Sequence, residues 1–229
     1  MDVIAHIETD FPTKFGVPRQ SGLVKGLKGR IIFTPEYRNP DALRGLEGFS
    51  HIWLLWDFSQ AHDGKPWHPT VRPPRLGGNI RMGVWATRSP FRPNHIGLSC
   101  VRILSIILHS PQGPVIEVEG ADMMSGTPIL DIKPYLPYAD AHPEARGGFA
   151  QEQNESVKPL QVEIPERLES LIPQEKRESL RTILASDPRP HYQNTPERTY
   201  VLPFSKLEIS FQVSEGTLTV TEVKSNVDE

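Results

Sequence analysis

Residues 82–101 read MGVWATRSPFRPNHIGLSCV and place a stiff basic loop between two apolar segments that favour β-strands. Pro90 and Pro93 fix their own φ angles and bias the residues before them away from the α conformation. The loop is therefore extended before any ligand arrives, and little entropy is lost on binding. Its guanidinium, hydroxyl and amide groups can donate to a carboxylate, a phosphate or a base edge. A well-ordered surface turn between strands is the alternative interpretation.

Short β segments lie on both sides of this loop. The pattern of apolar residues predicts strands at 3–8, 30–33, 51–58, 81–87, 97–108, 115–121 and 129–133. Residues 51–58, HIWLLWDF, are apolar on both faces, which predicts a central strand buried on both sides with Trp53 and Trp56 in the core. Repeated short strands with little helix between them predict a closed barrel or a sandwich.

The pattern changes after residue 138. Residues 139–160 are polar and read as a linker, and helices are predicted at 165–172 and 175–185, with Leu168, Leu171 and Ile172 on one apolar face. Strands at 199–202, 207–213 and 218–223 follow. The sequence therefore predicts a mainly β protein, with an N-terminal β-barrel at 1–140 and a small α+β C-terminal domain at 141–229.

Composition limits the classes of function. The single cysteine, Cys100, excludes an intrachain disulfide and a thiolate cluster, and its apolar segment predicts a buried side chain. We expect no metal site, because His62 and His68 have no recognised zinc spacing. The N-terminus lacks a secretory pattern and no run is long enough for a membrane span, so a cytoplasmic protein is expected.

Charge is distributed unevenly along the chain. The formal net charge is -3, but residues 64–116 contain seven basic residues and no Asp or Glu. A local positive field on a nearly neutral protein suits a modest anionic target such as a tRNA loop. A solvated basic face without function is the alternative.

The basic loop resembles the signature of the TsaA-like family, also called TrmO. Four further stretches resemble motifs of that family in the same order: KFGVPRQ (14–20), RPPRLGGN (72–79), GTPILDIKPYLPY (126–138) and DPRPHY (187–192). Ser125 and His95 depart from the family pattern, which has an acidic residue and a proline at these positions. The resemblance implies an S-adenosylmethionine-dependent tRNA methyltransferase, built on a β-barrel and working as a homodimer.

The resemblance also implies a set of site residues. The implied cofactor contacts are Pro18, Arg19, Gln20, Arg88, Leu98, Asp122, Met124, Ser125, Gly126 and Thr127. The implied target is the exocyclic nitrogen of threonylcarbamoyladenosine, on the 3′ side of the anticodon, with Asp131 and Tyr135 as catalytic candidates. Asp131 can act as a weak base or can orient Lys133 or a tyrosine. The expected contacts with the anticodon loop are Arg72, Arg75, Arg92, Asn94 and Lys133.

Two other functions stay open from the sequence. A non-catalytic RNA-binding protein can use the same basic loop. A hydrolase of phosphate or carboxylate substrates is the second alternative, but it needs an activated nucleophile or a metal-bound water, and no Ser-His-Asp grouping is evident. The glycine-rich turn of a dinucleotide-binding fold is also missing from the sequence. The cofactor assignment therefore rests on the resemblance.

Overall fold

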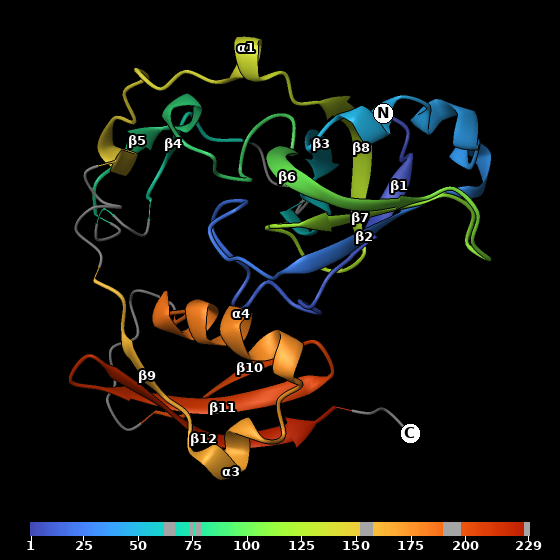
Figure 1. The fold of residues 1–229 in the computed structure, drawn as a ribbon. Helices are drawn as coiled ribbons and strands as arrows, with labels where there is room; N and C mark the ends of the chain where they lie inside the picture. Colours follow the sequence, from blue (N-terminus) through green and yellow to red (C-terminus); the bar gives the residue numbers. More distant parts are fainter. Residues whose placement is uncertain (62–66, 74–75, 77–78, 152–157, 190–197, 227–229) are drawn as a thin grey trace.

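The computed structural model describes residues 1–61, 67–73, 76, 79–151, 158–189 and 198–226. In these residues, six antiparallel strands close a barrel in the spatial order β1-β2-β7-β6-β3-β8 (Figure 1). The strands are β1 (Ala5–Glu8), β2 (Lys28–Phe33), β3 (His51–Asp57), β6 (Ile96–Ile107), β7 (Val115–Glu119) and β8 (Thr127–Pro134). The predicted mainly β fold with an N-terminal barrel is confirmed.

Closure of the barrel buries one face of each strand. In β3, Ile52 and Leu54 are fully buried and Trp56 is 7% exposed, while Trp53 lies half-buried on the outer face. The prediction that β3 is buried on both sides, with Trp53 in the core, is therefore wrong. Cys100 is paired with Trp53 across β6 and β3 and is also half-buried on the outer face, so its predicted burial is wrong too.

The connection between β3 and β6 forms an arm beside the barrel. Its described residues include the two-stranded pair β4 (Thr70–Val71) and β5 (Met82–Gly83) and the 3-10 turn η6 (Val84–Ala86) (Figure 1). The strand predicted over 81–87 is thus only two residues long. The chain turns after Gly83 because Val84 is fully buried and its N–H donates to the Pro69 carbonyl at 2.9 Å. The N–H and hydroxyl of Thr87 then both donate to the Val84 carbonyl and close the turn.

Between β2 and β3, the chain makes three 3-10 turns, η1 (Pro35–Tyr37), η2 (Pro40–Leu43) and η3 (Leu46–Gly48). A further turn, η4 (Ser59–Ala61), follows β3, and α1 (Pro137–Asp140) follows β8. Among the described residues, no helix is long and apolar enough to cross a membrane.

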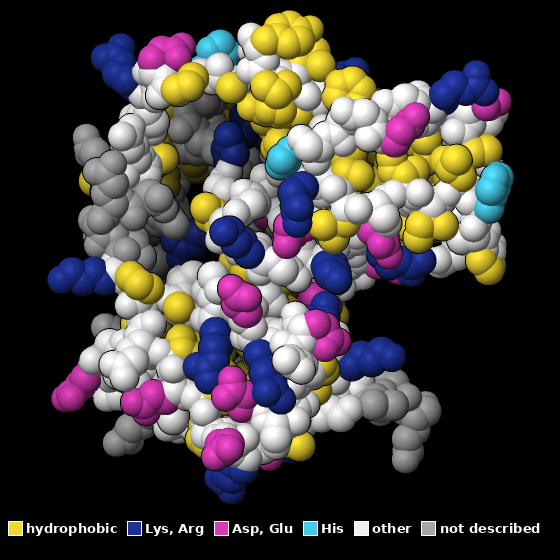
Figure 2. All heavy atoms as spheres, viewed as in Figure 1, with side chains coloured by type: hydrophobic (Ala, Val, Ile, Leu, Met, Phe, Trp, Pro, Cys, Tyr) yellow, Lys and Arg dark blue, Asp and Glu magenta, His cyan; other side chains and the backbone are white. Residues whose placement is uncertain are grey.

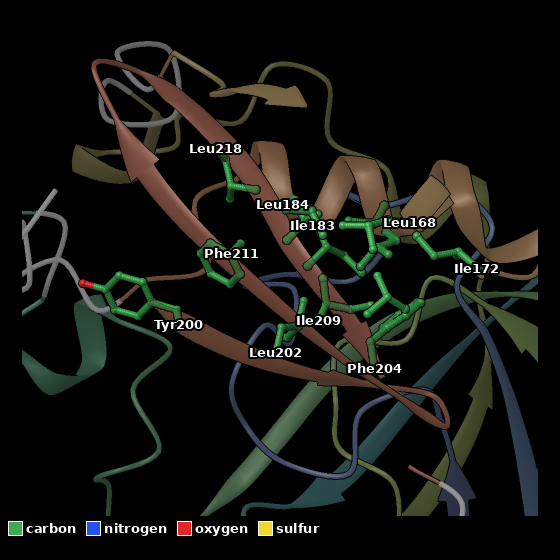
Figure 3. Close-up of a cluster of buried hydrophobic side chains, with 14 of the residues drawn as sticks. Leu168, Ile172, Ile183, Leu184, Tyr200, Leu202, Phe204, Ile209, Phe211 and Leu218 are labelled. Atoms are coloured by element: carbon green, nitrogen blue, oxygen red, sulfur yellow. The ribbon is translucent and has the colours of Figure 1, made fainter. Parts of the chain in front are cut away.

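The C-terminal part is a four-stranded sheet with helices. It comprises β9 (Gln161–Glu163), α3 (Glu166–Glu169), α4 (Gln174–Ala185), β10 (Tyr200–Phe204), β11 (Leu207–Ser214) and β12 (Thr217–Ser225). The sheet order is β10-β11-β12-β9, with β9 parallel to β12. Figure 3 shows α4 packing its buried Ile183 and Leu184 against the sheet. Leu168 and Ile172 join this core, but Leu171 is 55% exposed, contrary to the prediction.

The N-terminal segment 9–27 belongs to both parts of the molecule. Phe11, Val24 and Leu27 are buried in the C-terminal core, and the Phe11 ring meets the Phe204 ring edge-on at 5.7 Å. Gly16 has φ +83°, and a Cβ on it would lie 2.3 Å from Leu202 Cδ1, so a larger residue does not fit. This segment therefore fixes the C-terminal sheet to the end of the barrel.

Candidate cofactor and substrate site

Residues 20–22 lie against the barrel at the start of strand β6. The Ser21 hydroxyl accepts a hydrogen bond from the Cys100 N–H at 3.2 Å, and the Gly22 N–H donates to the Gly120 carbonyl at 2.9 Å. From the other side, the Arg88 guanidinium donates to the Gln20 side-chain oxygen. The structure thus brings together Gln20 and Arg88, two predicted cofactor residues that lie far apart in the sequence.

Asp122 lies next to this pair. Its carboxylate accepts a hydrogen bond from the Ser99 hydroxyl at 2.5 Å, and Ser99 in turn accepts one from the Trp56 indole at 2.9 Å. Burial raises the pKa of Asp122 above its ordinary value, while the Ser99 hydrogen bond and the Arg88 charge oppose that rise. Gln20, Arg88 and Asp122 therefore form one electrostatic cluster, defined here as the Arg88 cluster.

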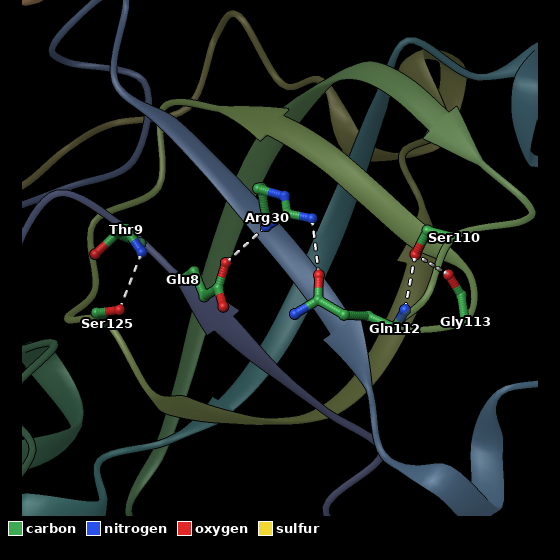
Figure 4. A network of polar contacts seen from close by, with 7 residues as sticks. All are labelled: Glu8, Thr9, Arg30, Ser110, Gln112, Gly113 and Ser125. Carbon is green, nitrogen blue, oxygen red and sulfur yellow. Dashed lines mark hydrogen bonds and ion pairs between the residues drawn. The ribbon is translucent and has the colours of Figure 1, made fainter.

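The turn that follows Asp122 is held by the end of strand β1. The Ser125 hydroxyl accepts from the Thr9 N–H at 3.3 Å (Figure 4), and the Ser125 N–H donates to the Phe11 carbonyl at 2.8 Å. The Gly126 N–H donates to the Ile7 carbonyl at 2.7 Å. Thr127 is 8% exposed, and its hydroxyl donates to the Met124 carbonyl at 2.8 Å. These N–H and hydroxyl groups hold the turn in place. The Met124 carbonyl already accepts from Thr127, so the carbonyl oxygens of Ser125 and Gly126 are the ones suited to accept from a ligand.

The catalytic candidates lie on the outer face of the barrel. Leu98 on β6, Leu55 on β3 and Asp131 on β8 occupy one row across three neighbouring strands. Side chains opposite one another in antiparallel strands point to the same face, so Leu98, which is 51% exposed, and Asp131 face the same side. Lys133 Nζ lies 3.0 Å from Asp131 Oδ2, and the Ile132 N–H donates to Asp131 Oδ1 at 2.9 Å.

Tyr135 lies at the end of the same face, beyond Lys133. Its ring centroid is 5.7 Å from that of Trp53, whose indole donates to Asp140 at 3.0 Å. Strand β6 links this face to the Arg88 cluster, because its alternation points Leu98 outward and the next residue, Ser99, inward toward Asp122. One strand therefore positions both groups of predicted site residues.

The predicted RNA contacts are found on the arm and on β8. Arg72 and Asn94 are exposed, whereas Lys133 is paired with Asp131. Arg92 donates through Nη1 to the carbonyls of Thr87 and Ser89, at 3.1 and 3.2 Å. Arg75 lies outside the described residues. The arm thus presents positive charge, but part of the Arg92 guanidinium is used to hold the loop in shape.

Comparison with known proteins decides the family. The tRNA-methyltransferase O N-terminal domain matches residues 6–141, and the TrmO C-terminal domain matches residues 157–226. The chain belongs to the TrmO family. The tRNA (adenine(37)-N6)-methyltransferase of Escherichia coli (strain K12) is 41% identical over 222 residues, which cover 93% of this chain and 92% of that protein.

Pseudomonas aeruginosa supplies two further TrmO-family comparisons. One protein, named as a candidate S-adenosylmethionine-dependent methyltransferase, is 41% identical over 215 residues, which are 90% of this chain and 89% of that protein. The crystal structure of TrmO from the same species superimposes with a TM-score of 0.77 at 32% identity, covering 98% of this chain and 97% of that one. The family resemblance stated from the motifs is therefore confirmed, and so is the fold.

The residues present fit the cofactor implied by the TrmO family. The Arg88 guanidinium suits the carboxylate of a methionine moiety, because it offers paired donors. The Asp122 carboxylate is an acceptor for an ammonium or for ribose hydroxyls, and exposed Leu98 offers an apolar surface for a flat ring. At Gly126, φ is +83° and a Cβ would meet no atom within 4 Å, so the turn is open on that side.

Two TrmO-site residues were missed from the sequence. Ser99 holds the Asp122 carboxylate, and Ser21 holds the segment next to Gln20 against β6. Neither residue was predicted from the sequence. A signal existed for Ser99, because it is a hydroxyl at an inward position of β6, between the apolar inward residues Gly97 and Val101. Such a group needs a hydrogen-bond partner in the core. Ser21 gave no comparable signal, since serines are common in loops.

Proposed function

We propose that this chain methylates the exocyclic nitrogen of adenosine 37 in tRNA, with S-adenosylmethionine as the methyl donor. Membership of the TrmO family and the activity named for the E. coli relative support this proposal. The observation that carries it is the Arg88 cluster, in which a guanidinium, a carboxylate and an open turn meet at the end of the barrel. We further propose that residues 1–140 form the cofactor-binding and catalytic unit, and that the enzyme acts in the cytoplasm.

Methyl transfer requires mainly that the methyl donor and the acceptor nitrogen be held in the right positions. When bound, S-adenosylmethionine supplies an electrophilic methyl group on a sulfonium, so no protein nucleophile is required. In this proposal Arg88, with Arg19, binds the methionine carboxylate, and Asp122 accepts from the amino group or the ribose. Leu98 covers the adenine ring, and the carbonyl oxygens of Ser125 and Gly126 accept from the adenine amino group. Pro18 and Gln20 hold the two arginines in place.

The acceptor base is placed on the outer face of β8. Asp131 accepts the proton that the attacking nitrogen loses, since its carboxylate is oriented by Lys133 and the Ile132 N–H. Tyr135, packed at 5.7 Å from Trp53, offers a ring beside which a base can stack. We propose that the base already carries a threonylcarbamoyl group, which eases the loss of that proton and adds a carboxylate that the arginines can bind.

We also propose that the enzyme works as a homodimer. The outer face of β6, β3 and β8 carries apolar side chains, among them Leu98, and Tyr138 in α1 is 87% exposed. A second copy against this face would exclude water from a substrate held between Leu98 and Asp131. A non-catalytic RNA-binding protein is the less favoured function, because it requires neither the half-buried Asp122 nor its contact with Ser99.

Nucleoside analysis tests the proposed function in cells. Transfer RNA from the source organism is digested with the gene present, deleted and restored, and the nucleosides are identified by mass spectrometry. The proposal predicts that a methylated form of threonylcarbamoyladenosine disappears on deletion and returns with the wild-type gene, but not with an Asp131→Asn version. An unchanged nucleoside profile in the deletion strain contradicts it.

A further inference from the structure

Two exposed indoles meet on the arm. Trp67 precedes β4 and Trp85 lies in η6, and their ring centroids are 5.8 Å apart with planes inclined by 32°. Trp67 is 48% exposed and Trp85 is 67% exposed. The β4–β5 pairing and the hydrogen bond from the Val84 N–H to the Pro69 carbonyl bring the two rings together from distant parts of the loop.

The Trp85 side of this indole pair is anchored. Val84, next to Trp85, is fully buried and anchors the turn, and the Arg92 guanidinium lies over the Trp85 ring at 5.6 Å. Because Arg92 also donates to the carbonyls of Thr87 and Ser89, its position over the ring is fixed. A ligand that stacks on Trp85 therefore meets a preformed ring, and little conformational entropy is lost at that residue on binding.

Large exposed indoles carry a solvation cost that a binding partner removes. The local charge indicates which partner. Residues 64–116 contain no acidic residue, and Arg72 and Arg81 on the same arm are exposed. Figure 2 shows dark-blue Lys and Arg side chains around a hollow beside the barrel. Aromatic rings among positive charges are the surface that single-stranded nucleic acids use, with bases on the rings and phosphates on the charges.

We propose that Trp67 and Trp85 form a stacking platform for an unpaired base of the anticodon loop. The inference rests on tRNA being the substrate and names the surface that holds the loop beside the reacting base. A second copy of the same patch is a poorer partner, because a two-fold contact would place two acid-free basic arms opposite one another. Arg92 contributes as the cation next to the platform, where a backbone phosphate follows the stacked base.

Fluorescence measures the stacking directly. The full-length protein is titrated, without methyl donor, with an RNA stem-loop carrying the anticodon loop and with a blunt RNA duplex of equal length. We expect the stem-loop to quench tryptophan emission and the duplex to leave it nearly unchanged. The quenching should shrink in Trp85→Phe, which keeps a ring to stack on but removes the reporter.

Affinity measurements separate stacking from charge. Trp67→Ala and Trp85→Ala should each weaken stem-loop binding about tenfold or more, with the salt dependence unchanged. Trp85→Phe should retain most of the affinity. Arg72→Ala should instead make the plot of log binding constant against log salt concentration shallower, by about one unit of slope. Leu171→Ala, which removes an exposed apolar side chain from the C-terminal part, is the control and should bind as the wild type does.

Three outcomes would overturn the platform. If both Trp→Ala variants bind the stem-loop with the affinity of the wild type, the platform is contradicted. Equal quenching by the duplex contradicts it as well. A change of oligomeric state in the Trp variants, with RNA affinity unchanged, would show that the indole pair is a contact between protein copies. These titrations measure RNA binding without methyl transfer. They therefore test the platform even if the proposed catalytic function is wrong.

Discussion

Lys176 Nζ in α4 lies 2.5 Å from Asp10 Oδ2, just after strand β1. The two side chains are only 20% and 11% exposed, and the Asp10 carbonyl also accepts from the Ser205 N–H at 2.6 Å. The ion pair joins the end of the barrel to α4, and the Ser205 hydrogen bond joins it to the turn between β10 and β11. It also fixes the start of segment 9–27, which carries Gln20 to the Arg88 cluster.

The first prediction concerns this pair. Lys176→Met leaves the Asp10 carboxylate nearly buried without its cation and should lower the free energy of unfolding by about 3 kcal/mol. Arg44→Met is the matched control, because the Arg44–Asp41 pair is 78% and 71% exposed and should contribute no more than about 0.5 kcal/mol. Urea unfolding of both variants measures the difference. If the two variants lose equal free energy of unfolding, the Asp10–Lys176 pair stabilises the protein no more than an exposed pair does.

The second prediction concerns Arg88. Removing its guanidinium in Arg88→Ala should weaken S-adenosylmethionine binding about tenfold or more, since a charge-assisted hydrogen bond is lost. Arg88→Lys keeps the charge but not the paired donors. Its affinity for S-adenosylmethionine should therefore lie between those of the wild type and Arg88→Ala. Isothermal calorimetry gives the affinities, and thermal unfolding confirms that both variants fold. If Arg88→Ala binds the cofactor normally but tRNA weakly, Arg88 faces the RNA instead.

The third prediction is a pH dependence set by Asp122. Burial raises the pKa of this carboxyl, and its ionised form attracts a cationic cofactor. Affinity should therefore be full above the raised pKa and fall as the pH drops through it, at a higher pH than for an ordinary aspartate. Ser99→Ala removes a hydrogen bond that lowers this pKa, so the fall should move to still higher pH. Asp122→Asn should bind weakly and without this transition, and a transition that persists in Asp122→Asn belongs to another group.

The fourth prediction separates catalysis from binding. Asp131→Asn should lower kcat by about 10²- to 10⁴-fold, the range typical of a lost general base, and leave cofactor affinity near that of the wild type. Glu117→Gln on β7 alters another half-buried strand carboxylate and should have little effect on kcat. A small loss in Asp131→Asn, with a raised KM for tRNA, would make Asp131 a positioning residue for Lys133 or the RNA.

Much of the barrel could be predicted because its strands alternate. In β7, Ile116 and Val118 point inward and are fully buried, while Glu117 and Glu119 point outward, as the pattern indicates. The outer position of Trp53 could not be predicted, since apolar side chains on both faces of β3 look the same in a sequence as a strand buried on both sides. Closure of the sheet decides which face is inside.

The candidate site could be predicted only in part, because it is made by long-range register. Motif resemblance singled out Gln20, Arg88 and Asp122, and the structure brings them together. The row that joins Leu98 to Asp131 depends on strand pairing that no local pattern specifies. Likewise, the contact between Trp67 and Trp85 depends on two strands of two residues each, which are too short to give a periodic signal.

The most direct test of the central claim is methyl transfer by the purified protein. Labelled S-adenosylmethionine is incubated with tRNA that carries threonylcarbamoyladenosine and with the same tRNA made as an unmodified transcript, and the labelled fragment is located after ribonuclease digestion. The account predicts label in the modified tRNA alone, at position 37 of the anticodon loop, with the initial rate of labelling lowered by about 10²-fold or more in Asp131→Asn. Equal labelling of the two tRNAs, or label outside the anticodon loop, would contradict it.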